Sequence, residues 1–328
     1  MKRIVTPSPF AAHAAAALLA LAAVPASAAW TVTENGAPSG CTHVISDGNW
    51  QIGVYKYSDD NWNLGKYSGA NGSGYVAGSG DLDLTGVAAD CGVVIKASNN
   101  GALERIAGLT SIVFPDSLET MYGNTVAGCK ALTNAVVGSG IRSMGQQVFY
   151  DCSSLKTVTL PEGCPGLTKL GNAAFRMCKN LETPLDFSKS VFTELPTYAL
   201  VDLQKVMEIR LPETVTTLGD ESLRYHAGPR AIWFYGPPPT SIAGTALEPK
   251  TSPVSSWVLV AARKHAAEWK ADERVLPFEG TEQETAVAAA KALGLTGVKP
   301  VGKWTTGTNG TKHWVVEELP AETMLLLK

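Results

Sequence analysis

The sequence lacks a strong excess of charge of either sign and, after residue 28, any long apolar run. The formal net charge is only −3 across 328 residues, so the chain offers no basic surface for nucleic acid or for an anionic membrane. No later stretch approaches the roughly 18 apolar residues that a membrane-spanning helix requires. We therefore expect no nucleic-acid partner and no transmembrane segment in the mature chain.

Residue patterns for catalysis and for metal or cofactor binding are also missing. None of the five histidines lies in a His-Glu-x-x-His motif or accompanies a Gly-x-Ser-x-Gly nucleophile elbow. The Gly72-x-Gly74 pair has neither the strand–helix context nor the following Lys-Ser/Thr of a phosphate-binding loop. His43 and Asp47 are neighbours in sequence only, which is a weak indication of a catalytic pair. We predict a protein that is not an enzyme and has no catalytic residue, metal or cofactor.

Residues 1–28 have the pattern of a secretory signal peptide. Lys2 and Arg3 provide a basic start, residues 10–24 are an almost unbroken Ala/Leu run, and Ala26-Ser27-Ala28 offers small residues at the cleavage spacing. The first cysteine, Cys41, does not follow Ala28 directly, so a bacterial lipid anchor is not expected. The segment predicts an exported protein that is secreted or associated with the cell envelope.

What the chain does contain is an internal repeat. A leading apolar position recurs at nearly constant steps, at Leu109, Leu132, Leu155, Leu181, Val206 and, degenerately, Pro229. A period of about 23 residues indicates one supersecondary unit used repeatedly, each unit too small to bury its own apolar side. The third unit is slightly longer, and its extra residues fall in the loop at 162–166, where an insertion is tolerated.

Each unit contains two short inward-facing runs. In one unit, Leu155, Val158 and Leu160 alternate with outward residues as a strand does, and Pro161 ends the strand because it cannot donate to a ladder. A second run, Leu-Gly-x-x-Ala-Phe at 170–175, follows the turn. The pattern predicts a mainly β, leucine-rich-repeat-type solenoid of about five to six coils, with strands about 4.8 Å apart.

The chain is expected to divide into four parts. Residues 1–28 are the signal peptide, and residues 29–100 form a β-rich N-terminal cap, which a solenoid needs to cover its first coil. Residues 101–278 form the solenoid with a terminal strand–helix cap. Residues 279–328 form a helix and a β-hairpin with its turn at Asn309-Gly310, so small α/β elements follow the array.

The repeat Cys-x-x-Leu-x-x-Val-x-Leu-Pro followed by Leu-Gly-x-x-Ala-Phe resembles the BspA-like leucine-rich repeat family of secreted and surface proteins. Residues 151–161 and 170–181 match best, and the likeness covers about 103–278. The resemblance implies a binding or adhesion scaffold and brings no catalytic motif. The chain departs from the family pattern at Tyr122, where a glycine is usual, and at Pro184, Asp186 and Pro229.

The six cysteines fall into two groups. Cys129, Cys152 and Cys178 occupy the same place in three successive units, where a disulfide or thiolate metal site competes with the simpler reading of small buried residues. We favour the second reading, because a later unit has Leu203 at this place. Cys41 and Cys91 lie outside the array and are candidates for a disulfide that staples the N-terminal cap. Cys164 is alone in the insertion loop.

The outward side of the strands is the candidate binding surface. Its predicted members are Lys156, Thr159, Glu208, Arg210, Arg230 and Trp233. Such residues align across coils into an extended surface, and Trp and Arg often dominate interfaces energetically, although an ordinary solvated face is the alternative. We expect a non-catalytic scaffold that recognises a protein or glycan partner at or outside the cell surface. The alternatives are a structural spacer or matrix protein and an enzyme with an unrecognised site in a flanking segment.

Overall fold

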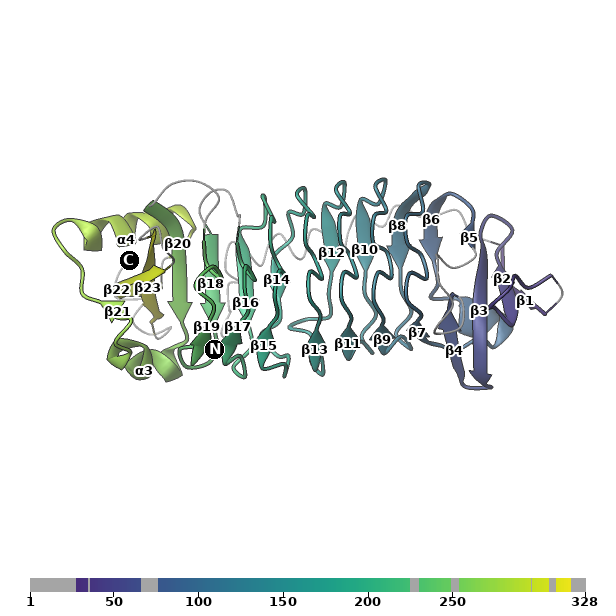
Figure 1. Ribbon diagram of the computed structural model, residues 1–328, viewed down its shortest axis with the longest axis horizontal. Coiled ribbons are helices and arrows are strands. Elements are labelled where there is room, and N and C mark those ends of the chain that lie inside the picture. The colour runs from purple at the N-terminus through teal and green to yellow at the C-terminus, as the bar shows by residue number, and fades with distance from the viewer. Residues whose placement is uncertain are drawn as a thin grey trace, which may run out of the picture.

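The protein is a rod of stacked coils (Figure 1), described by a computed structural model over residues 28–34, 36–65, 76–224, 230–248, 254–295, 297–306 and 311–319. The predicted signal-peptide core and the Asn309-Gly310 turn lie outside these described residues. Strands dominate and the solenoid makes about six turns, so the predicted fold class is confirmed.

An antiparallel sheet covers the N-terminal end of the rod. It consists of β1 (Thr31–Thr33), β2 (His43–Ser46), β3 (Gln51–Ser58), β4 (Asn61–Leu64) and β5 (Val76–Ala77). β4 then pairs in parallel with β7 (Ile95–Ser98), so the cap continues one sheet of the solenoid rather than forming a separate body. The short helix α2 (Val87–Cys91) follows β6 (Gly80–Asp83) and precedes β7 in the sequence.

Two parallel ladders form the first half of the solenoid. One contains β6 (Gly80–Asp83), β8 (Leu109–Val113), β10 (Asn134–Val136) and β12 (Thr157–Thr159). The other contains β7, β9 (Thr120–Met121), β11 (Ser143–Met144) and β13 (Lys169–Leu170). Asn134 pairs with Ser111 on one side and Thr157 on the other, so the register reproduces the step of the sequence repeat. The ladders begin at β6 and β7, before residue 100.

Both ladders are interrupted after the third unit, which contains the extra residues, and two new parallel sheets follow. The new sheets contain β14 (Leu185–Asp186), β16 (Glu208–Leu211), β18 (Arg230–Phe234) and β20 (Val254–Ala261) on one side and β15 (Glu194–Leu195), β17 (Thr217–Leu218) and β19 (Ser241–Ile242) on the other. Pro184 has no N–H for a ladder bond. The Thr183 hydroxyl contacts Val158 in both roles: it donates to the Val158 carbonyl at 3.4 Å and accepts the Val158 N–H at 3.1 Å. Strand pairing is therefore interrupted between β12 and β14, near Pro184, while the buried core continues across the break.

A hairpin, a 3-10 helix and two α-helices close the C-terminal end. β23 (Thr311–Glu318) pairs in parallel with β20, and β22 (Val298–Thr306) and β21 (Val275–Leu276) add antiparallel strands. The 3-10 helix η1 (Arg263–His265) leads into α3 (Ala266–Ala271), and α4 (Glu282–Ala292) follows. α4 packs on the outer face of this sheet through Ala286 and Ala290. The last sheet of the solenoid thus runs without a break into the hairpin.

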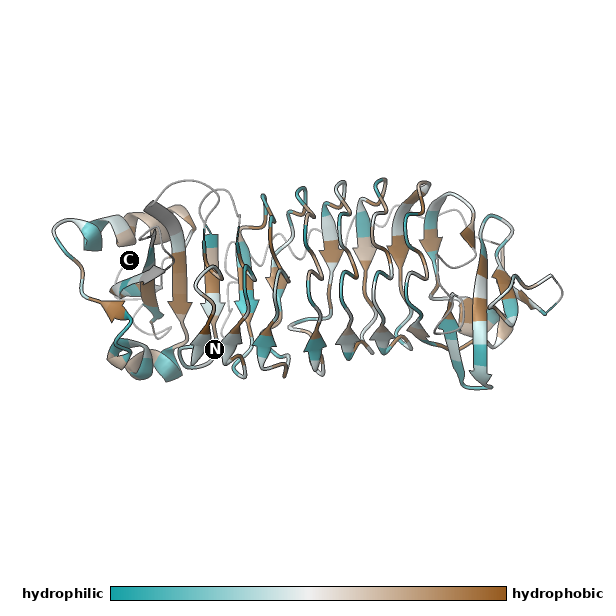
Figure 2. Cartoon of the chain, viewed as in Figure 1, coloured by the Kyte–Doolittle hydropathy of each residue, from teal (hydrophilic) through white to brown (hydrophobic). Residues whose placement is uncertain are grey.

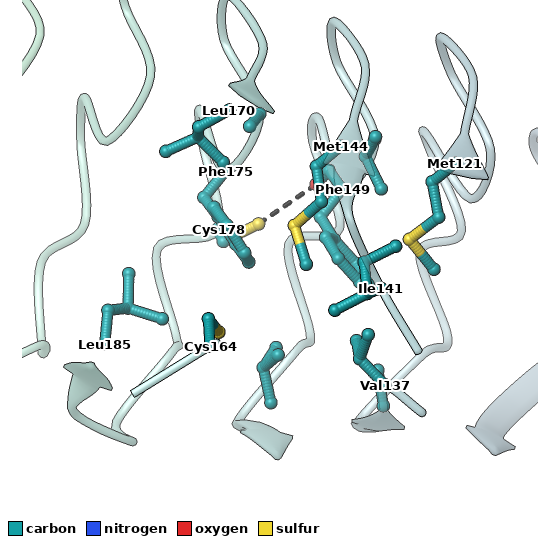
Figure 3. Close-up of a cluster of buried hydrophobic side chains, with 14 of the residues drawn as sticks. Met121, Val137, Ile141, Met144, Phe149, Cys164, Leu170, Phe175, Cys178 and Leu185 are labelled. Carbon is teal, nitrogen blue, oxygen red and sulfur yellow. Dashed lines mark hydrogen bonds between the residues drawn. The ribbon is translucent and has the colours of Figure 1, made fainter. Parts of the chain in front are cut away.

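One continuous core runs along the rod. The repeated leucine positions, Leu109, Leu132, Leu155, Leu181 and Val206, are all fully buried in the same cluster. Apolar positions accordingly recur from coil to coil (Figure 2). Figure 3 shows Met121 and Met144, and Phe149 and Phe175, at equivalent places in neighbouring coils. The two phenylalanine rings stack with centroids 5.1 Å apart.

The turns repeat as closely as the strands do. Each central coil has two left-handed residues four positions apart, such as Gln147 (φ 56°) and Asp151 (φ 57°). The first column is Gly101, Asn124, Gln147, Ala173, Tyr198 and Glu221, and the second is Arg105, Gly128, Asp151, Met177 and Asp202. Left-handed backbone is unfavourable for most residues. Stacking therefore imposes this geometry on whatever residue type the coil supplies.

Candidate functional site

An open hollow of about 570 Å³ lies on the ladder face formed by β9, β11, β13 and β15. Its size falls in the range of ligand-binding pockets in general. It crosses successive coils, so it runs along the rod and across the strands. Its lining residues are Asn100, Tyr122, Gly123, Gly145, Gln146, Thr168, Lys169, Leu170, Gly171, Asn172, Phe192, Thr193, Glu194 and Pro196.

Missing side chains create the floor of this hollow. Tyr122, Gly145, Gly171 and Pro196 occupy one column, with one residue from each successive coil. A Cβ on Gly171 would lie 2.2 Å from the carbonyl carbon of Gly145, so the coils approach too closely for any side chain there. Tyr122 keeps its side chain and is 49% exposed, which places an aromatic ring at one end of the hollow.

Three amide side chains line the neighbouring column. Asn100, Gln146 and Asn172 are exposed, and a Cβ on Gly123 would lie 3.0 Å from Asn100 Oδ1 and 3.1 Å from Gln146 Cγ. Asn100 and Gln146 therefore flank the gap that Gly123 leaves. Each amide offers two donors and an acceptor carbonyl. No hydrogen bond to another described residue occupies these three side chains.

The charges around the hollow balance. Lys169 and Glu194, from β13 and β15, are both exposed and line it together. Thr168 Oγ1 donates to the Arg142 carbonyl at 3.0 Å, which fixes that wall. The described lining contains no histidine, cysteine or carboxylate pair. The arrangement suits non-covalent contact with a polar molecule rather than proton transfer or nucleophilic attack.

Most predicted surface residues lie on the opposite ladder face, in two separate places. Lys156 and Thr159 are exposed at β12. Glu208 is buried and accepts a 2.7 Å hydrogen bond from Arg210 Nε, and the Arg210 guanidinium lies 5.8 Å from the Trp233 ring centroid. Trp233 packs against the cluster beneath α4, so this part of the face is partly covered. Glu208, Arg210 and Trp233 therefore contact one another in the structure, but they do not form a continuous exposed surface.

Arg230 does not lie on the outer face where we expected it. Side chains alternate along a strand, so Arg230 shares the inner face with Ile232, whereas Trp233 has the opposite parity. The Arg230 guanidinium is buried, donates to the Val206 carbonyl at 2.7 Å and lies 5.4 Å from the Trp257 ring centroid. Burial lowers its pKa to about 9. Arg230 is an internal residue of the C-terminal end and not a surface contact.

The three aligned cysteines form a ladder of thiol hydrogen bonds. Cys129, Cys152 and Cys178 are fully buried thiols, and each Sγ donates to a carbonyl of the preceding coil at 3.0–3.1 Å. The dashed line in Figure 3 marks the bond from Cys178 to the Phe149 carbonyl. Burial raises the pKa of Cys129 to about 11 and that of Cys178 to about 12. These thiols therefore stay protonated and serve packing.

The remaining cysteines differ in burial. Cys164 is buried in the insertion loop, and burial raises its pKa to about 12. Cys91 is half-buried, and its Sγ donates to the Val87 carbonyl at 3.2 Å. The structure contains no bond between Cys91 and Cys41, and their oxidation to a disulfide stays a prediction.

Neither a candidate metal centre nor a membrane-spanning helix occurs within the described residues. No group of three or more His, Cys, Asp or Glu side chains within them could hold a metal ion. Among the helices of the same ranges, none is both long and apolar enough to cross a membrane.

The hollow was missed from the sequence, although a signal for it was present. The glycine of the Leu-Gly-x-x-Ala-Phe run recurs, and Tyr122 replaces it in one coil. A column of glycines that ends in a tyrosine is what forms the floor and its aromatic end. The sequence predicts the binding surface on the outward residues of the strands instead.

Solved structures with leucine-rich repeats are similar to this chain at low identity. The T. pallidum leucine rich repeat protein (TpLRR) is 18% identical, with 52% of this chain and 82% of that chain covered and a TM-score of 0.35. A leucine-rich repeat protein from Bacteroides ovatus is 14% identical, with 64% and 69% covered and a TM-score of 0.32. A leucine rich cell surface protein from Faecalibacterium prausnitzii is 12% identical, with 67% and 89% covered and a TM-score of 0.23.

No curated protein matches the sequence. Residues 96–228, however, match six copies of the BspA type leucine rich repeat region. The matched segment begins in β7 and runs through the coils that carry the buried leucine column. Residues 96–228 of this chain therefore contain BspA-type leucine-rich repeats.

Proposed function

We propose that this protein is an exported, non-catalytic scaffold that binds a partner outside the cell through the hollow on its β9–β11–β13–β15 face. The observation that carries the proposal is the set of exposed polar side chains around a floor of backbone. Exposed amides at Gln146 and Asn172, beside the ring of Tyr122, form a site for contacts that the fold itself does not use. The BspA-type repeat and the signal-peptide pattern support export and binding.

The proposal places the main binding surface away from the residues first suspected. Lys156 and Thr159 stay candidates for a second contact, because both are exposed at β12. Glu208, Arg210 and Trp233 are engaged with one another and with the elements beneath α4. Their side chains are already partly ordered and desolvated, so they have less to gain from a partner than the exposed amides of the hollow.

The test compares two double variants of the mature chain, residues 29–328. Gln146→Arg with Asn172→Arg fills the hollow with two long cationic side chains. Thr133→Arg with Thr159→Arg adds the same charge at exposed positions on the opposite face. Binding of each labelled protein to intact cells of the producing species and to their extracellular matrix is measured by flow cytometry and sedimentation.

Loss of binding only in the hollow variant supports the proposal. Equal binding by both variants excludes the hollow as the binding surface. No binding by the unmodified chain favours a structural spacer, in which the rod only separates its two ends. Fractionation of the same cells tests export, because a protein retained in the cytoplasm contradicts it.

A further inference from the structure

We propose that the partner of the hollow is a neutral oligosaccharide chain that lies along the rod axis, with one sugar ring stacked on Tyr122. This inference rests on the proposed binding function and specifies its ligand class. Three features of the hollow support it: its length across the coils, the chemistry of its side chains and the pairing of β9 and β11 on both sides in its floor.

The hollow has the shape of a site for an extended chain. Its lining runs from Asn100 in one coil through Gln146 and Asn172 to Pro196, which spans four coil-to-coil steps. At the spacing of neighbouring strands, this is a length of roughly 19 Å. A single small metabolite would occupy only part of such a site, whereas a chain of several sugar units would contact every coil.

The side chains match hydroxyl groups better than charges. Amides both donate and accept, so Asn100, Gln146 and Asn172 can each bind a pair of neighbouring sugar hydroxyls. Lys169 and Glu194 offer opposite charges on adjacent strands, so the hollow has no net attraction for a phosphate or a polyanion. The half-exposed ring of Tyr122 provides an apolar face for the C–H side of a sugar ring, with a polar hydroxyl at its edge.

A peptide is disfavoured by the same floor. Extended peptides commonly bind by adding a strand to an unpaired sheet edge. Here β11 is paired on both sides, with β9 and β13, and the Gly145 N–H already donates to the Met121 carbonyl at 2.7 Å. A peptide could pair its backbone only at the break between β13 and β15, where each strand is the last of its sheet, and not along the other coils of the hollow.

Calorimetric titration with defined hexamers tests the ligand class. The probes are cello-, malto-, manno- and xylohexaose, with hexagalacturonate as the anionic control and an uncharged hexapeptide as the peptide control. Tyr122→Ala removes the platform, and Gln146→Ala with Asn172→Ala removes two amides. Lys156→Ala is the matched control on the opposite face. All four positions are exposed, and circular dichroism checks that each variant keeps its fold.

The expected result is that at least one neutral hexasaccharide binds with Kd below about 1 mM. Tyr122→Ala and the double amide variant each weaken this binding about tenfold or more, whereas Lys156→Ala leaves it unchanged. Failure of every neutral sugar to bind, tighter binding of the galacturonate or peptide, or equal affinity in the hollow variants overturns the inference. If the hollow-dependent cell binding described above persists in that case, only the ligand class is wrong. If it is absent too, the binding function itself fails.

Discussion

The central coils and the C-terminal end of this rod are built from the same ladder but have different interiors. Between Leu132 and Leu181 the interior contains leucines, phenylalanines, methionines and thiols, repeated column by column. At the C-terminal end it contains Arg230 and His313, both fully buried, together with the rings of Trp257, Trp269 and Trp304. One region is periodic and apolar, and the other is aperiodic and aromatic.

The difference follows from what covers each coil. A central coil is covered on both sides by copies of itself, so its cross-section needs only side chains of constant size. The last coil has no following copy, so larger aromatic side chains and the β22–β23 hairpin close it. Trp269 spans this junction, with ring centroids 5.1 Å from Phe234 and 5.6 Å from Trp304. Closing a solenoid therefore requires residues that the repeat itself does not supply.

Trp269→Ala is expected to have the largest effect and to be confined to the C-terminal end. The change empties a fully buried site and removes the Nε1–H donated to the Gly236 carbonyl at 3.1 Å. It should cost about 3–5 kcal/mol of unfolding free energy. Hydrogen exchange should show protection lost from β18 onward and kept at Leu155, and Glu273→Ala, at an exposed position, should have little effect. Uniform loss of protection would mean that the two regions unfold as one.

Leu155→Ala should cost about 2–5 kcal/mol and weaken coils on both sides of its own. Leu155 is fully buried in the middle of the core, and nearest-neighbour coupling spreads the defect along the rod. The measurement is chemical denaturation combined with residue-level hydrogen exchange, with Lys156→Ala as the exposed neighbour control. A defect limited to one coil would contradict the coupling assumed here.

Gly171→Ala should cost about 1–3 kcal/mol, because overpacked contacts force a backbone shift. The new Cβ would lie 2.2 Å from the carbonyl carbon of Gly145, whereas a Cβ on Gly244, at the periphery, meets no atom within 4 Å. Gly244→Ala is therefore the matched control and should leave the melting temperature nearly unchanged. Similar melting temperatures for both variants would show that the coils can move apart at the hollow with little loss of stability.

His313 should make only the C-terminal end sensitive to mild acid. Burial lowers the pKa of His313 to about 3 from an ordinary value of 6.5, so the folded state binds fewer protons than the unfolded one. Its contribution is fully present above pH 6.5 and falls toward pH 3, by at most roughly 1.4 kcal/mol per pH unit. Hydrogen exchange at β20 and β23, followed from pH 7 to 4, should show this slope in the wild type. The slope should be absent in His313→Gln.

The repeat and its register could be predicted from the sequence because they depend on spacing. Leu132 and Leu155 lie one period apart, and only stacked coils bury both at one place. The position of Arg230 could not be obtained in the same way. It required the parity within β18, and the repeated apolar column just before this strand continues only degenerately, as Pro229. The hollow could not be predicted for another reason. It forms where glycines have no side chain, whereas a sequence repeat is recognised from the side chains that recur.

The constant ladder register sets how this rod can change in length. Within the first half of the solenoid, each coil pairs with the next at equivalent residues, as between Ser111, Asn134 and Thr157. Duplicating one whole unit in this half would thus lengthen the rod by one strand spacing, about 4.8 Å, and keep the same pairing register at the new junction. Insertions shorter than a whole unit, such as the one at 162–166, have to be accommodated in a longer loop between strands instead. Gene duplication can therefore adjust the reach of such a molecule in fixed increments.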